Sequence, residues 1–252
     1  MHIPTGMNWH LIVEPDGRSG SQNMAVDEAL LLEADRAGTA FLRLYRFTPA
    51  CLSFGRNEPA LERFDRAAIE RLGLDVVRRP TGGRAVWHDH ELTYAVAAPV
   101  AAFGSLRDSY RSIHVRLASA LQQLGIPATL APDRNGRVAL GPGACFSAPV
   151  GGEVVVAGKK VIGSAQVRRG TAFLQHGSIL LNGSQDAINA ISYQPSANGS
   201  GSLAEILGRR VTFDAVTKAI IAAWGLGLAP TVPYRPLPSP TVFSDPSWTW
   251  RR

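Results

Sequence analysis

The sequence predicts an α+β fold in which a mainly antiparallel sheet is flanked by helices. Strand-like runs and helical runs are grouped along the chain more than they alternate, and Gly-containing turns join successive strand-like runs as in hairpins. The 252 residues are 45% hydrophobic and 18% charged, which suits a globular protein with a sizeable core. Because the chain shows no repeat, low-complexity tract or linker, we expect one domain over 1–252, with its core at about 20–228 and a Pro-rich C-terminal extension over 229–252.

The first half of the chain reads as two helices and two pairs of strands. Residues 22–36 form a helical pattern that Ser21 would cap and Gly38 would end. Apolar side chains recur at helical spacing over 61–72, and Gly73 ends that pattern. Strands are expected at 40–47, 50–54, 74–79 and 85–97, with a Gly-Gly turn between the last two.

The second half begins with the clearest helix. Over 106–124, apolar side chains recur on one face between a capping Ser105 and a closing Gly125. Helical patterns return over 203–208 and 213–225, and the Pro-rich tail is expected to wrap over the surface in extended form. Between these helices, three strand-like runs separated by tight turns cover 153–157, 160–167 and 171–181.

Composition restricts the classes of function. The net charge of +6 favours an acidic partner, which is either nucleic acid or an acidic carrier protein. Nucleic-acid binding is disfavoured because the aromatic residues are not interleaved with the basic ones. The two cysteines form neither a disulfide framework nor a zinc motif. Neither a signal peptide nor a membrane-spanning run is visible, so we expect a cytoplasmic protein that does not bind membranes.

A glycine pair within RRPTGGRAVWHD lies between two predicted strands, where it offers backbone amides to a ligand. The arginines Arg78, Arg79 and Arg84 around it suit a phosphate or a carboxylate, although a tight hairpin with solvated arginines fits the pattern equally well. His88 and His90 would share one face of the following strand and could ligate zinc. Because no third ligand has a suggestive spacing, we predict no metal site.

Two further segments carry residues with reactive chemistry. Cys145 follows a Gly-Pro-Gly sequence at an expected turn, where a nearby cation would make its thiol reactive, whereas Cys51 lies in an apolar run typical of a core. Lys160 follows fifteen residues after Cys145, in a run that also fits a solvated basic hairpin. The polar stretch 175–178 interrupts an apolar strand and therefore needs hydrogen-bond partners or a function.

Together these segments resemble the biotin/lipoate protein ligase superfamily over about residues 20–225. RRPTGGRAVWHD is similar to its Arg-Arg-x-Ser/Thr-Gly-Gly-x-x-Val-x-His-Asp signature, GKKVIGSAQ to its Gly-x-Lys-Ile-x-Gly-x-Ala-Gln strand, and LQHGSILL to the strand that follows. NMAVDEALLLE is similar to the opening helix of the superfamily. The Ala-Cys-Phe sequence at Cys145 and the run HDHELTY resemble its cysteine-dependent octanoyltransferases, in the branch that otherwise looks like lipoate ligases. The resemblance implies the catalytic-domain fold of the superfamily.

The resemblance also implies a reaction. An octanoyl group would pass from octanoyl-acyl carrier protein to the lipoyl-domain lysine of an acceptor, with the glycine cleavage H protein as the expected acceptor, through an acyl-thioester on Cys145. Lys160 would stabilise the thiolate and move protons. Backbone amides of Gly82 and Gly83, supported by His88, are candidates to bind the oxyanion. The other implied substrate-binding residues are Arg79, Thr81, Ser164, Gln166 and His176.

No ATP, metal or prosthetic group is expected, and the family suggests a monomer. Five arginines are expected to steer the acidic carrier protein and lipoyl domain, namely Arg78, Arg79, Arg84, Arg168 and Arg169.

Two alternatives stay open at this point. An ATP-dependent lipoate-protein ligase would use Lys160 and the glycine pair to hold phosphate and carboxylate, leaving Cys145 incidental. An amidotransferase would instead move lipoyl or octanoyl groups between lipoyl domains. Val150 and the following Gly151 and Gly152 depart from the family pattern, so the identity of the acceptor is open.

Overall fold

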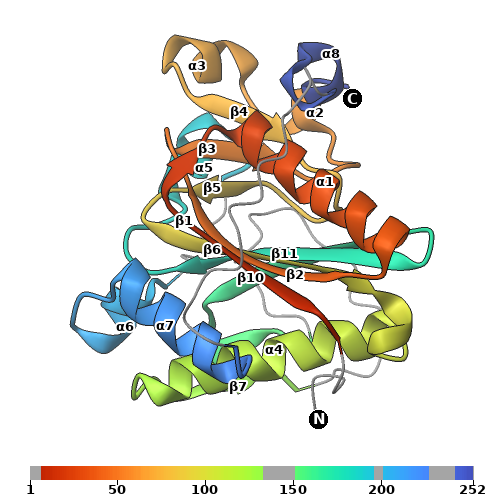
Figure 1. Cartoon of the computed structure of the whole chain (residues 1–252). Helices are drawn as coiled ribbons and strands as arrows, with labels where there is room; N and C mark the ends of the chain where they lie inside the picture. Colours follow the sequence, from red (N-terminus) through yellow and green to blue (C-terminus); the bar gives the residue numbers. More distant parts are fainter. Residues whose placement is uncertain (1–6, 133–150, 196–200, 227–241, 252) are drawn as a thin grey trace.

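The computed structural model describes residues 7–132, 151–195, 201–226 and 242–251. Its centre is a five-stranded sheet with the strand order β1-β2-β6-β11-β10 (Figure 1). Within this sheet β1 and β2 run parallel and the other neighbours antiparallel. The strands are β1 (Trp9–Arg18), β2 (Ala40–Phe47), β6 (Glu91–Pro99), β10 (Ile162–Arg169) and β11 (Ala172–Leu180).

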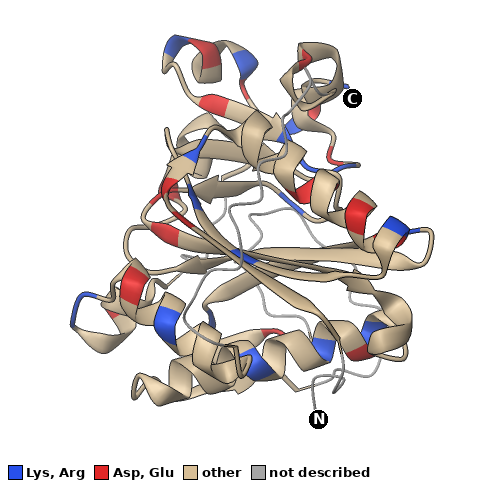
Figure 2. Ribbon diagram, viewed as in Figure 1, with Lys and Arg blue, Asp and Glu red and all other residues tan. Residues whose placement is uncertain are grey.

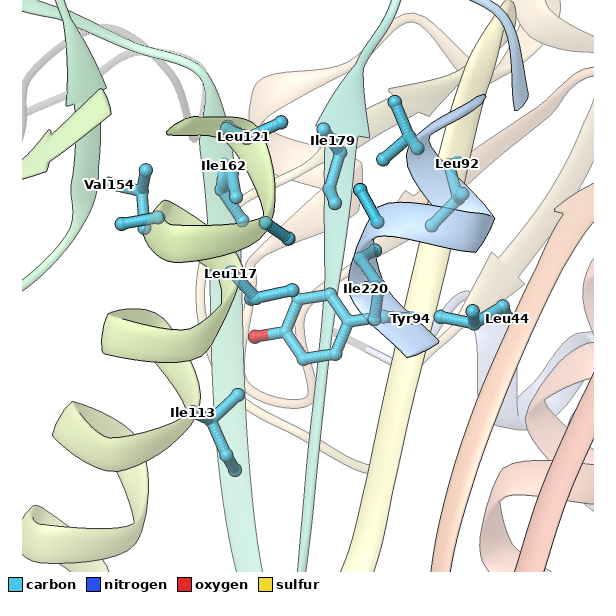
Figure 3. Packing of buried hydrophobic residues seen from close by; sticks show 14 of the residues in the cluster. Leu44, Leu92, Tyr94, Ile113, Leu117, Leu121, Val154, Ile162, Ile179 and Ile220 are labelled. Carbon is cyan, nitrogen blue, oxygen red and sulfur yellow. The ribbon is translucent and has the colours of Figure 1, made fainter. Parts of the chain in front are cut away.

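Helices cover both faces of the sheet. Helix α1 (Gly20–Ala37) lies along one face, and α4 (Leu106–Gln123) and α7 (Phe213–Ala223) lie along the other (Figure 1). Figure 3 shows Leu117 and Leu121 of α4 facing the strands β10 and β11. They belong to a large buried cluster of apolar residues, whose burial stabilises this layer by about 0.8 kcal/mol for each CH₂ group. The α+β prediction with a mainly antiparallel sheet is confirmed.

Two small sheets flank the central one. The strand orders are β4-β3-β5 and β7-β8-β9. Their strands are β3 (Cys51–Phe54), β4 (Asp75–Arg78), β5 (Val86–His88), β7 (Ala128–Leu130), β8 (Val154–Val156) and β9 (Lys159–Lys160). The short helices are α2 (Ala60–Arg63), α3 (Arg66–Arg71), α5 (Asp186–Ile191), α6 (Leu203–Leu207) and α8 (Pro246–Thr249), with 3-10 turns η1 (Val100–Ala102) and η2 (Val242–Ser244).

The longest helices follow their sequence signals closely. The Ser105 side chain caps α4 as predicted, and Gly38 ends α1 in the left-handed region at φ 68°. The predicted cap of α1 is wrong, because Ser19 rather than Ser21 occupies that position. Ser19 and Gln22 form a capping box, so the helix begins two residues earlier than predicted.

Three other predictions about secondary structure are wrong. The predicted helix 61–72 is two short helices, because Asp65 is extended and its side chain caps α3. The predicted strand 85–97 breaks at His90, which turns with φ 51°, so that β5 joins a small sheet and β6 the central one. The described end of the tail forms η2 and α8 rather than an extended strand. Strand β1 was not predicted at all.

Charged residues lie mainly on outer helices and loops, whereas the central strands are mostly uncharged (Figure 2). Arg43 of β2 is an exception, because its side chain is fully buried under α1. None of the helices in the described ranges combines the length and the hydrophobicity that crossing a bilayer requires.

Candidate active site

A pocket opens where α1, β2, β5 and the β10–β11 hairpin meet. It encloses about 380 Å³, its open mouth included. Met24, Phe47 and Val86 supply apolar lining, and the backbone around Gly163 and Gly177 forms another part of the wall. Five residues predicted from the sequence line this pocket, namely Arg79, Gly83, His88, Ser164 and His176. The structure therefore brings together side chains that are up to about a hundred positions apart in the sequence.

His176 is held by a buried carboxylate on α1. Its Nδ1 donates to Oδ2 of Asp27 over 2.8 Å, and Asp27 also accepts hydrogen bonds from Arg43 and Tyr45. Burial alone would raise the pKa of Asp27, but the His176 hydrogen bond and the Arg43 charge outweigh it and lower that pKa. Burial lowers the pKa of His176, so the ring is neutral and its Nε2 accepts from the Thr81 hydroxyl at 2.7 Å. Thr81 thus ties the glycine-pair loop to β11.

His88 is held by a second buried carboxylate. Its Nδ1 lies 2.7 Å from Oε1 of Glu91, and its Nε2 lies 2.6 Å from the Ser53 hydroxyl. The Glu91 carboxylate also accepts hydrogen bonds from the hydroxyls of Thr93 and Ser178. Because a carboxylate can only accept, the Nδ1 of His88 donates, which defines the orientation of the ring.

Arg79 shapes the glycine-pair loop from inside. Its guanidinium donates to the backbone oxygens of Ser53, Gly82 and Arg84 over 2.8 to 3.1 Å, and the residue is only 5% exposed. Gly83 has φ 93°, a conformation that few residues other than glycine adopt. Within the described ranges neither the Gly82 amide nor the Gly83 amide donates a hydrogen bond. These two N–H groups are therefore available to donate hydrogen bonds to a bound anion.

Ser164 connects the pocket wall to α4. Its hydroxyl lies 2.7 Å from the Tyr94 hydroxyl and 2.8 Å from Nε2 of His114. Figure 3 shows the Tyr94 side chain reaching into the layer between the sheet and α4. The Nδ1 of His114 donates to the carbonyl oxygen of Gly152 at 2.7 Å. Gly177 faces Ser164 across the strands, where a Cβ atom would lie 2.6 Å from the serine Oγ.

Lys160 is buried in an ion pair. Its Nζ lies 2.7 Å from Oε1 of Glu153, and the two side chains are 3% and 6% exposed. The solvated hairpin that the pattern allowed is therefore wrong at this position, although the neighbouring Lys159 is exposed. Cys145 and Val150 lie outside the described residues.

Three carboxylates of this region were not predicted. Asp27, Glu91 and Glu153 are each buried and each bonded to a basic side chain of the site. A signal existed for Asp27, which lies among the apolar residues of an otherwise amphipathic helix. Glu91 and Glu153 lie next to turns, where acidic residues are common. The sequence around them therefore does not indicate that they are buried.

The Gln166 amide donates hydrogen bonds to Ser109 and Gln175, and its predicted substrate-binding role stays a prediction. The predicted pairing of two histidines on one strand face is wrong. His88 and His90 do not share a face, because His88 is buried whereas His90 lies exposed in a turn. Within the described ranges no three His, Cys, Asp or Glu side chains gather as metal ligands would.

The steering role fails for two of the five arginines. Arg78 is fully buried, and its guanidinium donates to backbone oxygens, one of them that of Thr249 in the C-terminal segment. Arg79 is buried as described above, so neither guanidinium group is exposed on the surface where it could attract an acidic protein. Arg168 and Arg169 at the tip of the β10–β11 hairpin are exposed, as steering requires.

Comparison with known proteins identifies one family, two similar enzymes and one similar crystal structure. The sequence matches the family described as the lipoyl protein ligase A/B catalytic domain over residues 19–225. It is 39% identical over 219 residues to octanoyltransferase LipM of Moorella thermoacetica, covering 80% of each chain. It is 34% identical over 244 residues to octanoyltransferase LipM of Bacillus subtilis, covering 87% of this chain and 86% of that one. A crystal structure of lipoate-protein ligase A bound with ATP shares the fold, with a TM-score of 0.71 and 24% identity over 87% of this chain and 85% of that one.

Proposed function

The chain belongs to the lipoyl protein ligase A/B catalytic-domain family, and from its pocket and its relatives we propose the reaction that it catalyses. It is an acyltransferase that acts in octanoyl transfer for lipoate biosynthesis. We propose that the donor is octanoyl-acyl carrier protein, that the acceptor is a lipoyl-domain lysine such as that of the glycine cleavage H protein, and that the acyl group passes through a thioester on Cys145.

The main support for this proposal is that the polar side chains of the pocket already have hydrogen-bond partners within the protein. His88 and His176 each bond a carboxylate on one side and a hydroxyl on the other. A polar group that is already satisfied costs little when an acyl chain covers it, whereas an unsatisfied one would be costly. The pocket therefore offers an octanoyl tail a mostly apolar surface, and burying six methylene groups contributes at most about 5 kcal/mol.

The chemistry proceeds in two steps. The Cys145 thiolate attacks the thioester carbonyl, a bond from its sulfur to the acyl carbon forms, and the bond to the carrier sulfur breaks. The carrier thiolate leaves and takes a proton from the Lys160 ammonium. The acceptor amine then attacks the enzyme thioester, the carbon–nitrogen bond forms, and the Cys145 thiolate leaves while the amine proton passes to Lys160.

The oxyanion of each tetrahedral intermediate needs donors. The Gly82 and Gly83 amides are suited to this role, because Arg79 holds the carbonyl of Gly82 and keeps the loop in place. His88, oriented by Glu91, supports the same site. The reaction requires no ATP, because the donor is already a thioester.

The test is the intact mass of the full chain after incubation with octanoyl-acyl carrier protein in the absence of ATP. We expect a gain of one octanoyl group that hydroxylamine removes and that Cys145→Ser abolishes. Cys51→Ser is the matched control, because Cys51 is buried in β3. We expect this variant to be acylated as the unaltered protein is. Without an adduct, acceptor modification that needs ATP and free acid would identify a ligase, and transfer from an octanoylated or lipoylated H protein alone would identify an amidotransferase.

A further inference from the structure

The Lys160–Glu153 ion pair is built into the fold. Lys160 ends the two-residue strand β9, which pairs antiparallel with β8, and Glu153 immediately precedes β8. The carbonyl of Glu153 accepts a hydrogen bond from the Ala131 amide at 2.7 Å, which attaches this hairpin to the end of β7. Both residues therefore lie on a hydrogen-bonded hairpin that brings Nζ of Lys160 within 2.7 Å of Oε1 of Glu153.

The described groups near Lys160 differ in the charge that they carry. The pKa of His114 is lowered to about 4, mainly by burial and in smaller part by the positive charge of Lys160. Burial, with the Glu153 charge as a minor contributor, raises the pKa of Tyr94, so its hydroxyl is neutral. The adjacent Lys159 is turned to the surface, where it pairs with Glu205 at 3.2 Å. Within the described residues, Glu153 therefore supplies Lys160 with a negative charge at hydrogen-bond distance.

We propose that Glu153 is a positioning residue that keeps Lys160 charged and holds its ammonium group in place. A buried lysine without a counter-charge loses its proton readily, because a low dielectric disfavours the charged form. A charged Lys160 can stabilise a thiolate and protonate a leaving thiolate, whereas a neutral one can do neither. The catalytic part of this inference rests on the proposed function, but the charge state of Lys160 does not.

The chain offers an unusually direct measurement of that charge state. It contains three lysines, and Lys159 and Lys218 have side chains that are 53% and 64% exposed. In the full chain labelled with ¹³C-lysine, the three Cε signals can be titrated separately, with the two exposed lysines as internal references. We expect Glu153→Gln, which keeps the shape but removes the charge, to move the Lys160 titration midpoint down by roughly 1 to 3 pH units. Glu205→Gln, which breaks the exposed pair of Lys159, should leave the Lys160 midpoint in place.

Acyl transfer supplies the second readout. Glu153→Gln should lower the rate of Cys145 acylation by roughly 100-fold, with little change in KM for the octanoyl donor, since the pocket is untouched. The pH optimum of the residual activity should move in the same direction as the Lys160 midpoint. Glu153→Asp keeps the charge at a shorter reach, so we expect a midpoint near that of the unaltered protein and a partial recovery of rate.

The outcomes separate the two proposals. A Lys160 midpoint that is the same in the unaltered protein and in Glu153→Gln would overturn the inference, whatever the activity. A shifted midpoint with unchanged acylation would overturn the catalytic role of the pair. A shifted midpoint in a protein that never becomes acylated would support the charge assignment while refuting the proposed function. If Glu153→Gln does not fold, Glu153→Asp still decides, because a midpoint that falls despite its retained carboxylate contradicts the inference.

Discussion

His114 makes a quantitative prediction about stability and pH. The ring is buried between Ser164 and the carbonyl of Gly152, and its pKa is about 4 compared with an ordinary value of 6.5. Below pH 6.5 the unfolded chain binds a proton at this residue that the folded protein does not. The free energy of unfolding therefore decreases as the pH falls from 6.5 to 4.

The size of the effect follows from the pKa difference. Each unit corresponds to about 1.4 kcal/mol, so His114 accounts for a loss of about 3 kcal/mol over this range. Burial lowers the pKa of His176 as well, so a second contribution of the same sign remains when His114 is replaced. The Asp27 carboxylate, whose pKa is below its ordinary 3.8, adds stability that is lost only at still lower pH.

The assay is urea unfolding, followed by far-UV circular dichroism, of the unaltered protein and His114→Asn at several pH values between 7.5 and 4.5. Asparagine retains a donor for the Gly152 carbonyl but cannot titrate. We expect the variant to be less stable at pH 7.5 by about 1–3 kcal/mol, since Ser164 loses its acceptor. Below pH 6.5 its free energy of unfolding should fall less steeply, by about 1.4 kcal/mol per pH unit. Parallel pH profiles for the two proteins would refute the reasoning.

Two further predictions concern the pocket and its approach. Gly177→Ala would place a methyl group 2.5 Å from a carbonyl oxygen of the neighbouring strand, so we expect a loss of about 1–3 kcal/mol in urea unfolding and a higher KM for the octanoyl donor; unchanged values would show that the strands can move apart. Reversing Arg168 and Arg169 to Glu should lower kcat/KM for protein substrates more than for a small octanoyl thioester, because steering acts on the charged protein, and an equal loss for both would contradict it.

Sequence reasoning succeeded where the determining interactions are local. Ser105 caps α4 through a hydrogen bond to an amide three residues away, and apolar periodicity selects the face that packs on the sheet. The glycine-pair loop was located for a similar reason, since Gly83 needs a backbone conformation that the residue type itself reveals. Local signals were misleading at Asp65 and His90, where a single residue interrupts a run of consistent propensity.

The sequence by itself determined the fold class, the positions of most helices and strands, and which segments could carry chemistry. Only the tertiary structure decided which charges are buried and what they bond. From the sequence, Arg78 and Lys160 both fit solvated surface residues. In the structure Arg78 donates to the carbonyl of Thr249, which is distant in the sequence, and Lys160 pairs with Glu153 across a hairpin. The reason is physical, because the free energy of a charged group depends on the water and partners around it, and those are set by residues that are distant in sequence or on a neighbouring strand.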